Sequence, residues 1–212
     1  MQLRQPSRGD AYPKDKVIEV RPAKGGTPPS FDGVGSAELH DRVREEMRAL
    51  LSSNEVTPYL DKQGAALLGE ARTNYRRLDL DRTRLLRLGD DVHIVTWRGD
   101  RTNDTLALSL TMRKFTSGNE GLSVVVRHRT IEEVGEALAS LYDEPVIGPI
   151  ELAQSVDNKM VEKWDPVLPD ELLNASFASA RVDVHGMRQV LAELLGKPLV
   201  DSSQTVGRSG CR

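Results

Sequence analysis

Cysteine is almost absent from this sequence, since the single one, Cys211, stands next to the last of 212 positions. A disulfide within the chain is therefore impossible, and we expect a reducing compartment, the cytoplasm. The 4 histidines are scattered without the paired spacing of metal ligands, so no metal site is expected. No stretch approaches the roughly 18 apolar residues of a membrane-spanning helix, and the N-terminus lacks the apolar segment of a signal peptide. We expect no membrane contact.

Motifs for catalysis and nucleotide binding are missing too. The sequence contains no G-x-x-x-x-G-K-[ST] phosphate loop, no G-x-G-x-x-G and no G-x-S-x-G nucleophile elbow. Paired carboxylates occur at Glu45–Glu46 and Asp90–Asp91, but none stands in the apolar surroundings that suit a catalytic acid. We therefore expect no cofactor, and an enzyme of unrecognised type ranks third, behind the two functions given below.

Hydrophobic periodicity predicts both helices and strands. Segment 103–115 is ambiguous, because its leucines alternate as in a strand, but we favour a helix. Thr130 and Glu133 form a capping box that predicts a helix start. The predicted helices cover 36–54, 58–78, 103–115 and 130–142, and the predicted strands cover 16–22, 92–97 and 122–128.

The order of these elements predicts an α+β fold, with a small mixed β-sheet packed with helices and followed by a helical C-terminal section. Pro149 and Pro169 stand where helices of that section are expected to start. We divide the chain into a strand with a Gly/Pro-rich linker, an α/β accessory domain, the helical section and a flexible tail. These segments are 1–36, 37–145, 146–196 and 197–212.

Charge is uneven along a chain whose net charge is −3. Eight arginines fall between residues 72 and 101, whereas acidic residues dominate from 130 to 175. Two interpretations stay open. The arginines form a groove for nucleic-acid phosphates, or the basic and acidic halves pair with each other.

The stretch WRGDRTN, residues 97–103, joins a predicted strand to a predicted helix. In a structural interpretation Gly99 permits a sharp turn and Thr102 or Asn103 caps the helix. Trp97 then belongs to the core or its rim.

In a functional interpretation the same strand end and helix N-terminus form an anion site. Arg98 and Arg101 would contact backbone phosphate, and Asn103 would bond phosphate or a base. Trp97 would stack on an unpaired base.

Three further cations extend this hypothesis. Lys24 lies in the Gly/Pro-rich linker, where Gly25 and Gly26 allow close approach to a phosphate. Arg76 and Arg77 stand at the end of a predicted helix, where cations also suit the helix dipole without binding a ligand.

Four segments follow one another in the order VIEVRPAKGGTPPSFDGVGSAELHDRVREEM, YLDKQGAALLGEARTNYRRLDLDRTRLL, VTWRGDRTNDTLAL and VEKWDPVLPDELLNASFASARVDVHGM. Together they resemble the C-terminal region of large bacterial DEAD/DEAH-box helicases of superfamily 2, over residues 15–195. The resemblance implies ATP-driven duplex unwinding by two motor domains. Their nucleotide loop and acidic box are missing from this sequence, so no catalytic residue carries over.

The resemblance therefore implies a C-terminal accessory piece or a truncated fragment, separate from its motor. We expect a non-catalytic accessory domain that binds nucleic acid, such as DNA, through the single-stranded or duplex backbone. Helicase motor domains or another protein are further expected partners. The alternative is a protein-interaction or scaffold module without nucleic-acid binding, in which the loops at 22–36 and 99–102 meet a partner chain.

Overall fold

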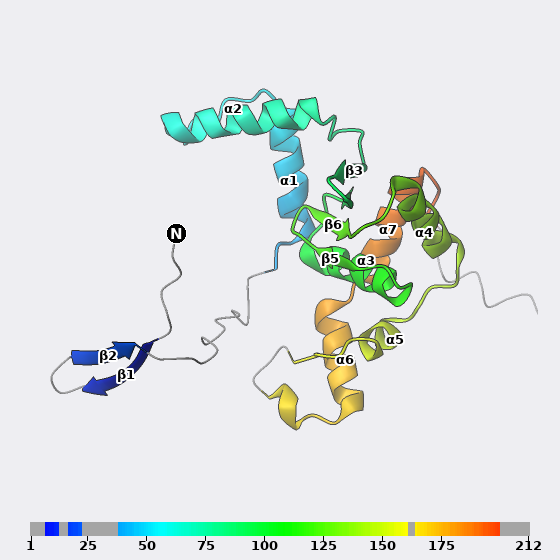
Figure 1. Cartoon of the computed structure of the whole chain (residues 1–212). Helices are drawn as coiled ribbons and strands as arrows, with labels where there is room; N and C mark the ends of the chain where they lie inside the picture. Colours follow the sequence, from blue (N-terminus) through cyan, green and yellow to red (C-terminus); the bar gives the residue numbers. More distant parts are fainter. Residues whose placement is uncertain (1–6, 13–16, 23–37, 161–163, 200–212) are drawn as a thin grey trace, which may run out of the picture. The chain divides into compact units, whose positions relative to one another are not determined.

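The computed structural model describes residues 7–12, 17–22, 38–160 and 164–199, and the chain separates into two units, Met1–Ser36 and Ala37–Arg212. The first unit contains strands β1 (Ser7–Tyr12) and β2 (Val17–Pro22), which pair antiparallel (Figure 1). The strand predicted at 16–22 is confirmed. Its expected place in the main sheet is wrong, because it pairs with β1, a strand that the sequence did not predict.

The second unit contains a four-stranded sheet in the order β3-β4-β6-β5, and every pair in it is antiparallel. Its strands are β3 (Leu85–Leu88), β4 (Asp91–Val95), β5 (Ser117–Asn119) and β6 (Ser123–Val126). The α+β class is confirmed, but the expectation of a mixed sheet is wrong. β4 and β6 take the centre because β-branched residues fill them, and Val92, Ile94, Val124 and Val126 are fully buried.

Helix α3 (Asp100–Met112) follows β4 directly, so the helix favoured for this segment is confirmed. It begins at Asp100 with Gly99 as its N-cap, and the expectation that Thr102 or Asn103 caps it is wrong. Leu106 and Leu110 lie one turn apart and face the core, which explains why alternating leucines did not make a strand.

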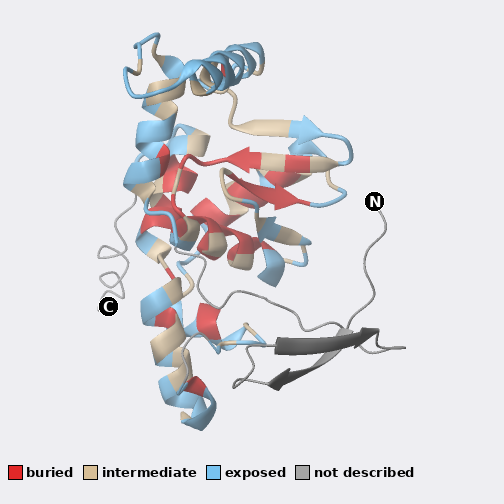
Figure 2. Ribbon diagram, turned by 90° about the vertical axis from the view of Figure 1, so that its left-hand side faces the viewer, coloured by how far each residue is buried: buried red, intermediate tan, exposed pale blue. Residues whose placement is uncertain are grey.

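Helices α4 (Ile131–Asp143) and α7 (Val184–Leu195) complete the core with α3. The capping box predicted for α4 is confirmed, since the Thr130 hydroxyl accepts from the Glu133 N–H and the Glu133 carboxylate accepts from the Thr130 N–H. Because α7 packs against both α3 and α4, the section predicted as 146–196 shares the core of residues 37–145. Figure 2 shows the buried residues gathered where these helices meet the sheet.

Two further helices contact α3. α5 (Pro149–Gln154) starts at Pro149 and α6 (Asp170–Arg181) starts just after Pro169, as predicted, with a short 3-10 turn, Asp165–Val167, before α6. α5 packs against α6, and both touch α3.

Helices α1 (Asp41–Ser52) and α2 (Lys62–Arg77) form a helical hairpin, which we call the α1–α2 arm. His40 and Asp61 cap the two helices, so the starts predicted at residues 36 and 58 both come too early. The arm is mostly exposed: α1 buries only Arg44 and α2 buries only Tyr75 (Figure 2).

Candidate functional site

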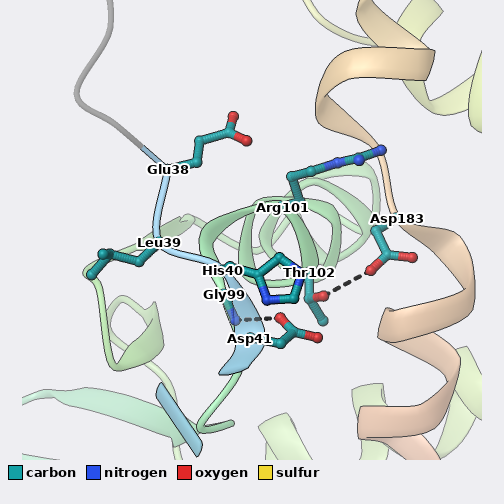
Figure 3. Close-up of a pocket in the computed structure, with 8 residues that line it drawn as sticks. All are labelled: Glu38, Leu39, His40, Asp41, Gly99, Arg101, Thr102 and Asp183. Atoms are coloured by element: carbon teal, nitrogen blue, oxygen red, sulfur yellow. Dashed lines mark hydrogen bonds between the residues drawn. The ribbon is translucent and has the colours of Figure 1, made fainter. Parts of the chain in front are cut away.

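The turn between β4 and α3, residues 96–99, lies where α1, α3 and α7 approach one another (Figure 3). Gly99 N–H donates to Asp41 Oδ1 at 2.6 Å, and Asp100 N–H donates to the Leu39 carbonyl at 3.0 Å. The Leu39 N–H in turn donates to Asp100 Oδ2 at 2.8 Å. The Arg-Gly-Asp tripeptide therefore clamps the start of α1 onto the start of α3.

A glycine is required at position 99 because a Cβ atom would clash with neighbouring backbone atoms, and not because the φ angle excludes other residues. Its φ is −71°, which any residue adopts, but a Cβ at this position would lie 2.3 Å from the Leu39 carbonyl oxygen and 2.7 Å from the Asp41 nitrogen. The residue with the unusual backbone is Trp97, whose φ of 57° lies in the left-handed region. The sharp turn expected at Gly99 is thus made at Trp97.

Asn103 is fully buried and its side-chain amide is fully used. Its Nδ2 donates to the carbonyls of Gly121 at 2.9 Å and Arg98 at 3.3 Å, and its Oδ1 accepts from Thr96 Oγ1 at 2.6 Å. These bonds fix the turn against the β5–β6 connection. The amide is therefore not available to a phosphate or a base.

Trp97 is buried, with 3% of its surface exposed. Its ring packs on Tyr75 with a centroid distance of 5.8 Å, and Val95 completes the cluster. The indole cannot stack on an unpaired base without leaving this cluster. The prediction that placed Trp97 in the core or its rim is confirmed.

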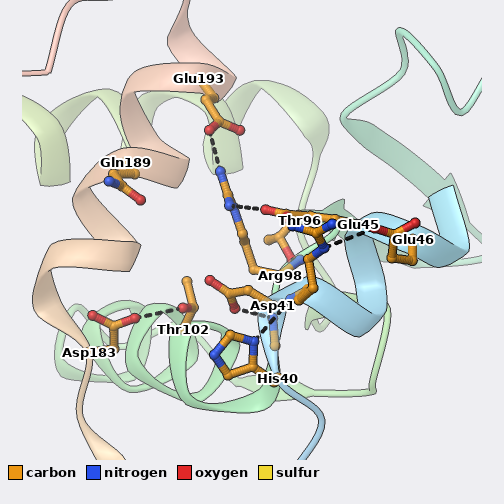
Figure 4. Close-up of polar contacts among 12 residues, drawn as sticks. His40, Asp41, Glu45, Glu46, Thr96, Arg98, Thr102, Asp183, Gln189 and Glu193 are labelled. Atoms are coloured by element: carbon orange, nitrogen blue, oxygen red, sulfur yellow. Dashed lines mark hydrogen bonds and ion pairs between the residues drawn. The ribbon is translucent and has the colours of Figure 1, made fainter. Parts of the chain in front are cut away.

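Arg98 joins two helices that are far apart in the sequence. Its guanidinium bonds Glu45 of α1 at 2.7 Å and also bonds Glu193 of α7, and 17% of its side chain is exposed (Figure 4). Both of the partners are partly exposed carboxylates, so the positive charge of Arg98 is paired at the protein surface.

Arg101 reaches across to the C-terminal end of α6. Its Nη2 donates to the Ser179 carbonyl at 2.9 Å and to the Val182 carbonyl at 3.0 Å. Carbonyls at the last turn of a helix have no partner within the helix and carry the negative end of its dipole, so a guanidinium suits them.

Two other arginines also donate hydrogen bonds to carbonyls near the end of a helix. Arg72 donates to the Leu50 carbonyl near the end of α1, and Arg188 donates to the Tyr142 carbonyl at 2.7 Å near the end of α4. Arg72, Arg101 and Arg188 thus each tie one element to the end of a helix.

The remaining predicted cations lie elsewhere. Arg76 and Arg77 occupy the last turn of α2, as predicted, and both are exposed, with Arg76 bonded to the Asn54 side chain. Lys24 lies outside the described residues. The structure therefore brings Trp97, Arg98, Arg101 and Asn103 together at one turn and keeps Arg76 and Arg77 on the arm.

The pairing of the basic and acidic halves is limited. Arg113 bonds Glu144, but Arg98 bonds Glu45 and Glu193, which lie outside the acidic stretch 130–175. Both interpretations of the charge pattern stay predictions.

A cleft of about 190 Å³ opens beside the clamp, between α1, α3 and α7 (Figure 3). His40 lines it, but its Nδ1 already accepts from the Arg42 N–H as the cap of α1. Thr102 donates to Asp183 Oδ2 at 2.9 Å, and Asp183 also caps α7. Within the part of the chain that the structure describes, no group of His, Cys, Asp and Glu side chains is arranged to hold a metal ion.

Sequence reasoning missed a half-buried carboxylate in a second cleft, of about 310 Å³, between α3 and α6. Burial raises the pKa of Asp104, with the nearby charges of Asp100 and Glu38 acting in the same direction. No motif marks Asp104, because its surroundings come from residues far along the chain.

The exposure of the α1–α2 arm was also missed. The helical spacing of its leucines predicts an apolar face, but Val56 is 85%, Tyr59 81% and Leu67 58% exposed. An amphipathic pattern indicates that a face is apolar, and it does not say what covers that face.

No family model, no curated protein and no solved structure matches the chain. Among the helices of the described ranges, none has both the length and the apolar character that crossing a bilayer demands.

Proposed function

We propose that residues 38–199 form a non-catalytic protein-interaction module whose docking element is the α1–α2 arm. The single observation that carries this proposal is the uncovered apolar surface of the arm, including Val56, Tyr59 and Leu67. Apolar surface of this kind marks interaction sites on soluble proteins. Its cost in water is offset when a partner covers it.

The arginines near the turn also support this choice over nucleic-acid binding. Arg98 is held between two carboxylates, and Arg101 is engaged with the end of α6. Trp97 and Asn103 are buried. A site built from these four residues would have to break the clamp before it could take a nucleic acid.

The helicase resemblance is compatible with this proposal. An accessory piece that docks on motor domains needs an exposed apolar element, and the arm provides one. We include the cytoplasm in the proposal, supported by the single cysteine of the chain.

Nucleic-acid binding stays a second candidate, favoured by one specific observation. Arg76, Arg77, Arg82 and Arg87 are all exposed at the end of α2 and along β3. Together they could follow a phosphate backbone. Asp79 and Asp90 lie among them and weaken the local positive charge.

Photo-crosslinking distinguishes these two candidates. The full chain would carry p-benzoylphenylalanine in place of Leu67 on α2 and, in a matched control, in place of Glu132, an exposed residue of α4. After irradiation in cells, we expect position 67 to give a protein adduct that position 132 does not give.

A nucleic-acid adduct at position 67 would support the second candidate. Equal adducts at both positions, or none at position 67, would overturn the proposal. Titration of a labelled single-stranded DNA at low salt gives an independent check, because the interaction module should leave its anisotropy unchanged.

A further inference from the structure

Within the α1–α2 arm, helix α2 is basic, whereas α1 carries three arginines and three carboxylates. α2 carries four cations, Lys62, Arg72, Arg76 and Arg77, and one carboxylate, Glu70. Arg72 is engaged with the end of α1, whereas Lys62, Arg76 and Arg77 are exposed. A partner of the arm should therefore offer an apolar surface flanked by carboxylates.

The α5–α6 end of the same unit has this complementary character. Val167 is 75% and Leu172 57% exposed there, and Ile150 of α5 is exposed as well. The exposed carboxylates of α5, of the segment after it and of the first turn of α6 are Glu151, Asp157, Asp170 and Glu171. The described part of this region, which we call the acidic end, contains one cation before Asp170, Lys159.

The two surfaces cannot cover each other within one chain. Helix α2 and helices α5 and α6 lie at opposite ends of the second unit, with the sheet and the core helices between them (Figure 1, Figure 2). The lengths of the helices are compatible, since the 16 residues of α2 and the 12 residues of α6 extend over about 24 Å and 18 Å.

We propose that the arm of one copy docks on the acidic end of a second copy. This inference rests on the proposed function and names its partner. Because the two surfaces differ, the contact is heterologous: a dimer keeps one arm and one acidic end unused, and assembly continues with concentration. Charge complementarity favours this arrangement over pairing of two arms, which would bring the cations of two α2 helices together.

The test uses the purified full chain and charge reversal on each surface. The arm variant is Arg76→Glu with Arg77→Glu, and the end variant is Glu151→Lys with Glu171→Lys. The matched control is Glu132→Lys with Glu136→Lys, a double reversal on the exposed face of α4. Circular dichroism melting first establishes that all three variants are folded.

Sedimentation velocity over a concentration series then measures assembly. We expect the unmodified chain and the control to grow beyond a dimer with concentration, and each of the two variants to associate about tenfold more weakly. Mixing the arm variant with the end variant should restore assembly, because the intact arm of the end variant meets the intact acidic end of the arm variant and the two reversed surfaces again carry opposite charges.

An unmodified chain that stays monomeric would overturn the inference, and so would a mixture that stays monomeric or variants that assemble like the control. These outcomes leave the proposed function standing if position 67 still crosslinks to another protein. A missing or nucleic-acid adduct at position 67 would instead remove the proposed function itself.

Discussion

Helices α2 and α3 differ in what covers them. α3 buries seven of its 13 residues, four of them polar, whereas the 16 residues of α2 bury Tyr75 alone. The buried polar residues of α3 are bonded, as Asn103 and Thr105 illustrate, so burial follows from position in the fold and not from hydrophobicity alone. α2 also has apolar residues, but only Tyr75 packs in a buried cluster, against Val95 and Trp97. An amphipathic pattern therefore predicts that a segment is helical more reliably than it predicts whether other elements cover the apolar face of that helix.

The largest difference between the two regions should appear on truncation of leucines. Leu138 of α4 is almost fully buried in the core, and Leu67 of the arm is mostly exposed. We expect Leu138→Ala to lower the free energy of unfolding by about 2–5 kcal/mol because it leaves a cavity. Leu67→Ala should change it by less than about 0.5 kcal/mol. Urea unfolding measures both, and equal effects would mean that the arm belongs to the core.

A matched pair of glycines gives the next largest contrast. The Cβ of Gly99→Ala would meet backbone atoms of residues 39 and 41, so we expect a loss of about 1–3 kcal/mol. Gly69 on α2 has open space around it, and Gly69→Ala should stabilise the helix by about 0.5–1 kcal/mol. The melting temperatures of the two variants should therefore shift in opposite directions. If Gly99→Ala leaves the melting temperature unchanged, the close contact of residue 99 with residues 39 and 41 does not explain why a glycine stands there.

The loss of stability on charge reversal should distinguish arginines that connect two elements from arginines that do not. Arg98→Glu would place a third carboxylate between Glu45 and Glu193, and we expect a loss of about 1–2 kcal/mol from the two pairs. Arg77→Glu on the arm should stay within about 0.5 kcal/mol of the unmodified chain. If Arg98→Glu leaves the melting temperature unchanged, then Arg98 is not needed to hold α1 and α7 together.

The smallest expected effect concerns pH. Because burial raises the pKa of Asp104 above that of the unfolded chain, the ionised carboxylate destabilises the fold once the pH rises through the unfolded value of about 3.9. Asp104→Asn should therefore stabilise the protein at neutral pH and lose this advantage in more acidic solution. Asp90→Asn, in the exposed turn before β4, removes the same charge and serves as the control. Stability curves from pH 3 to 8 test the sign.

The parts of the sequence prediction that are confirmed rest on patterns of neighbouring residues. The Thr130–Glu133 capping box, the prolines before α5 and α6, and the β-branched runs of β4 and β6 each specify structure within a few residues. Strands β3 and β5 were not predicted, because Leu85–Leu88 and Ser117–Asn119 are short and become strands by pairing with β4 and β6. The mixed sheet was wrong for a related reason, since pairing partners are not encoded locally.

The structure shows what residues 97–103 contact, and their proposed role in binding nucleic acid stays a prediction. The sequence drew attention to residues 97–103, and the structure does place a dense set of interactions there. The partners that decide their role, Leu39, Asp41, Glu45 and Glu193, lie about 50 to 100 positions away along the chain. Only the tertiary structure brings them to the turn.

The reciprocal bonds between Leu39 and Asp100 have a mechanical consequence. Leu39 receives one bond and gives another, directly before the first turn of α1, so a pull on the chain upstream of Glu38 would be transmitted to the first residue of α3. The force would then reach β4, a central strand of the sheet that directly precedes α3, without passing through α2. A tether attached at the N-terminal side would therefore hold the globular body firmly while leaving the second helix of the hairpin unstrained.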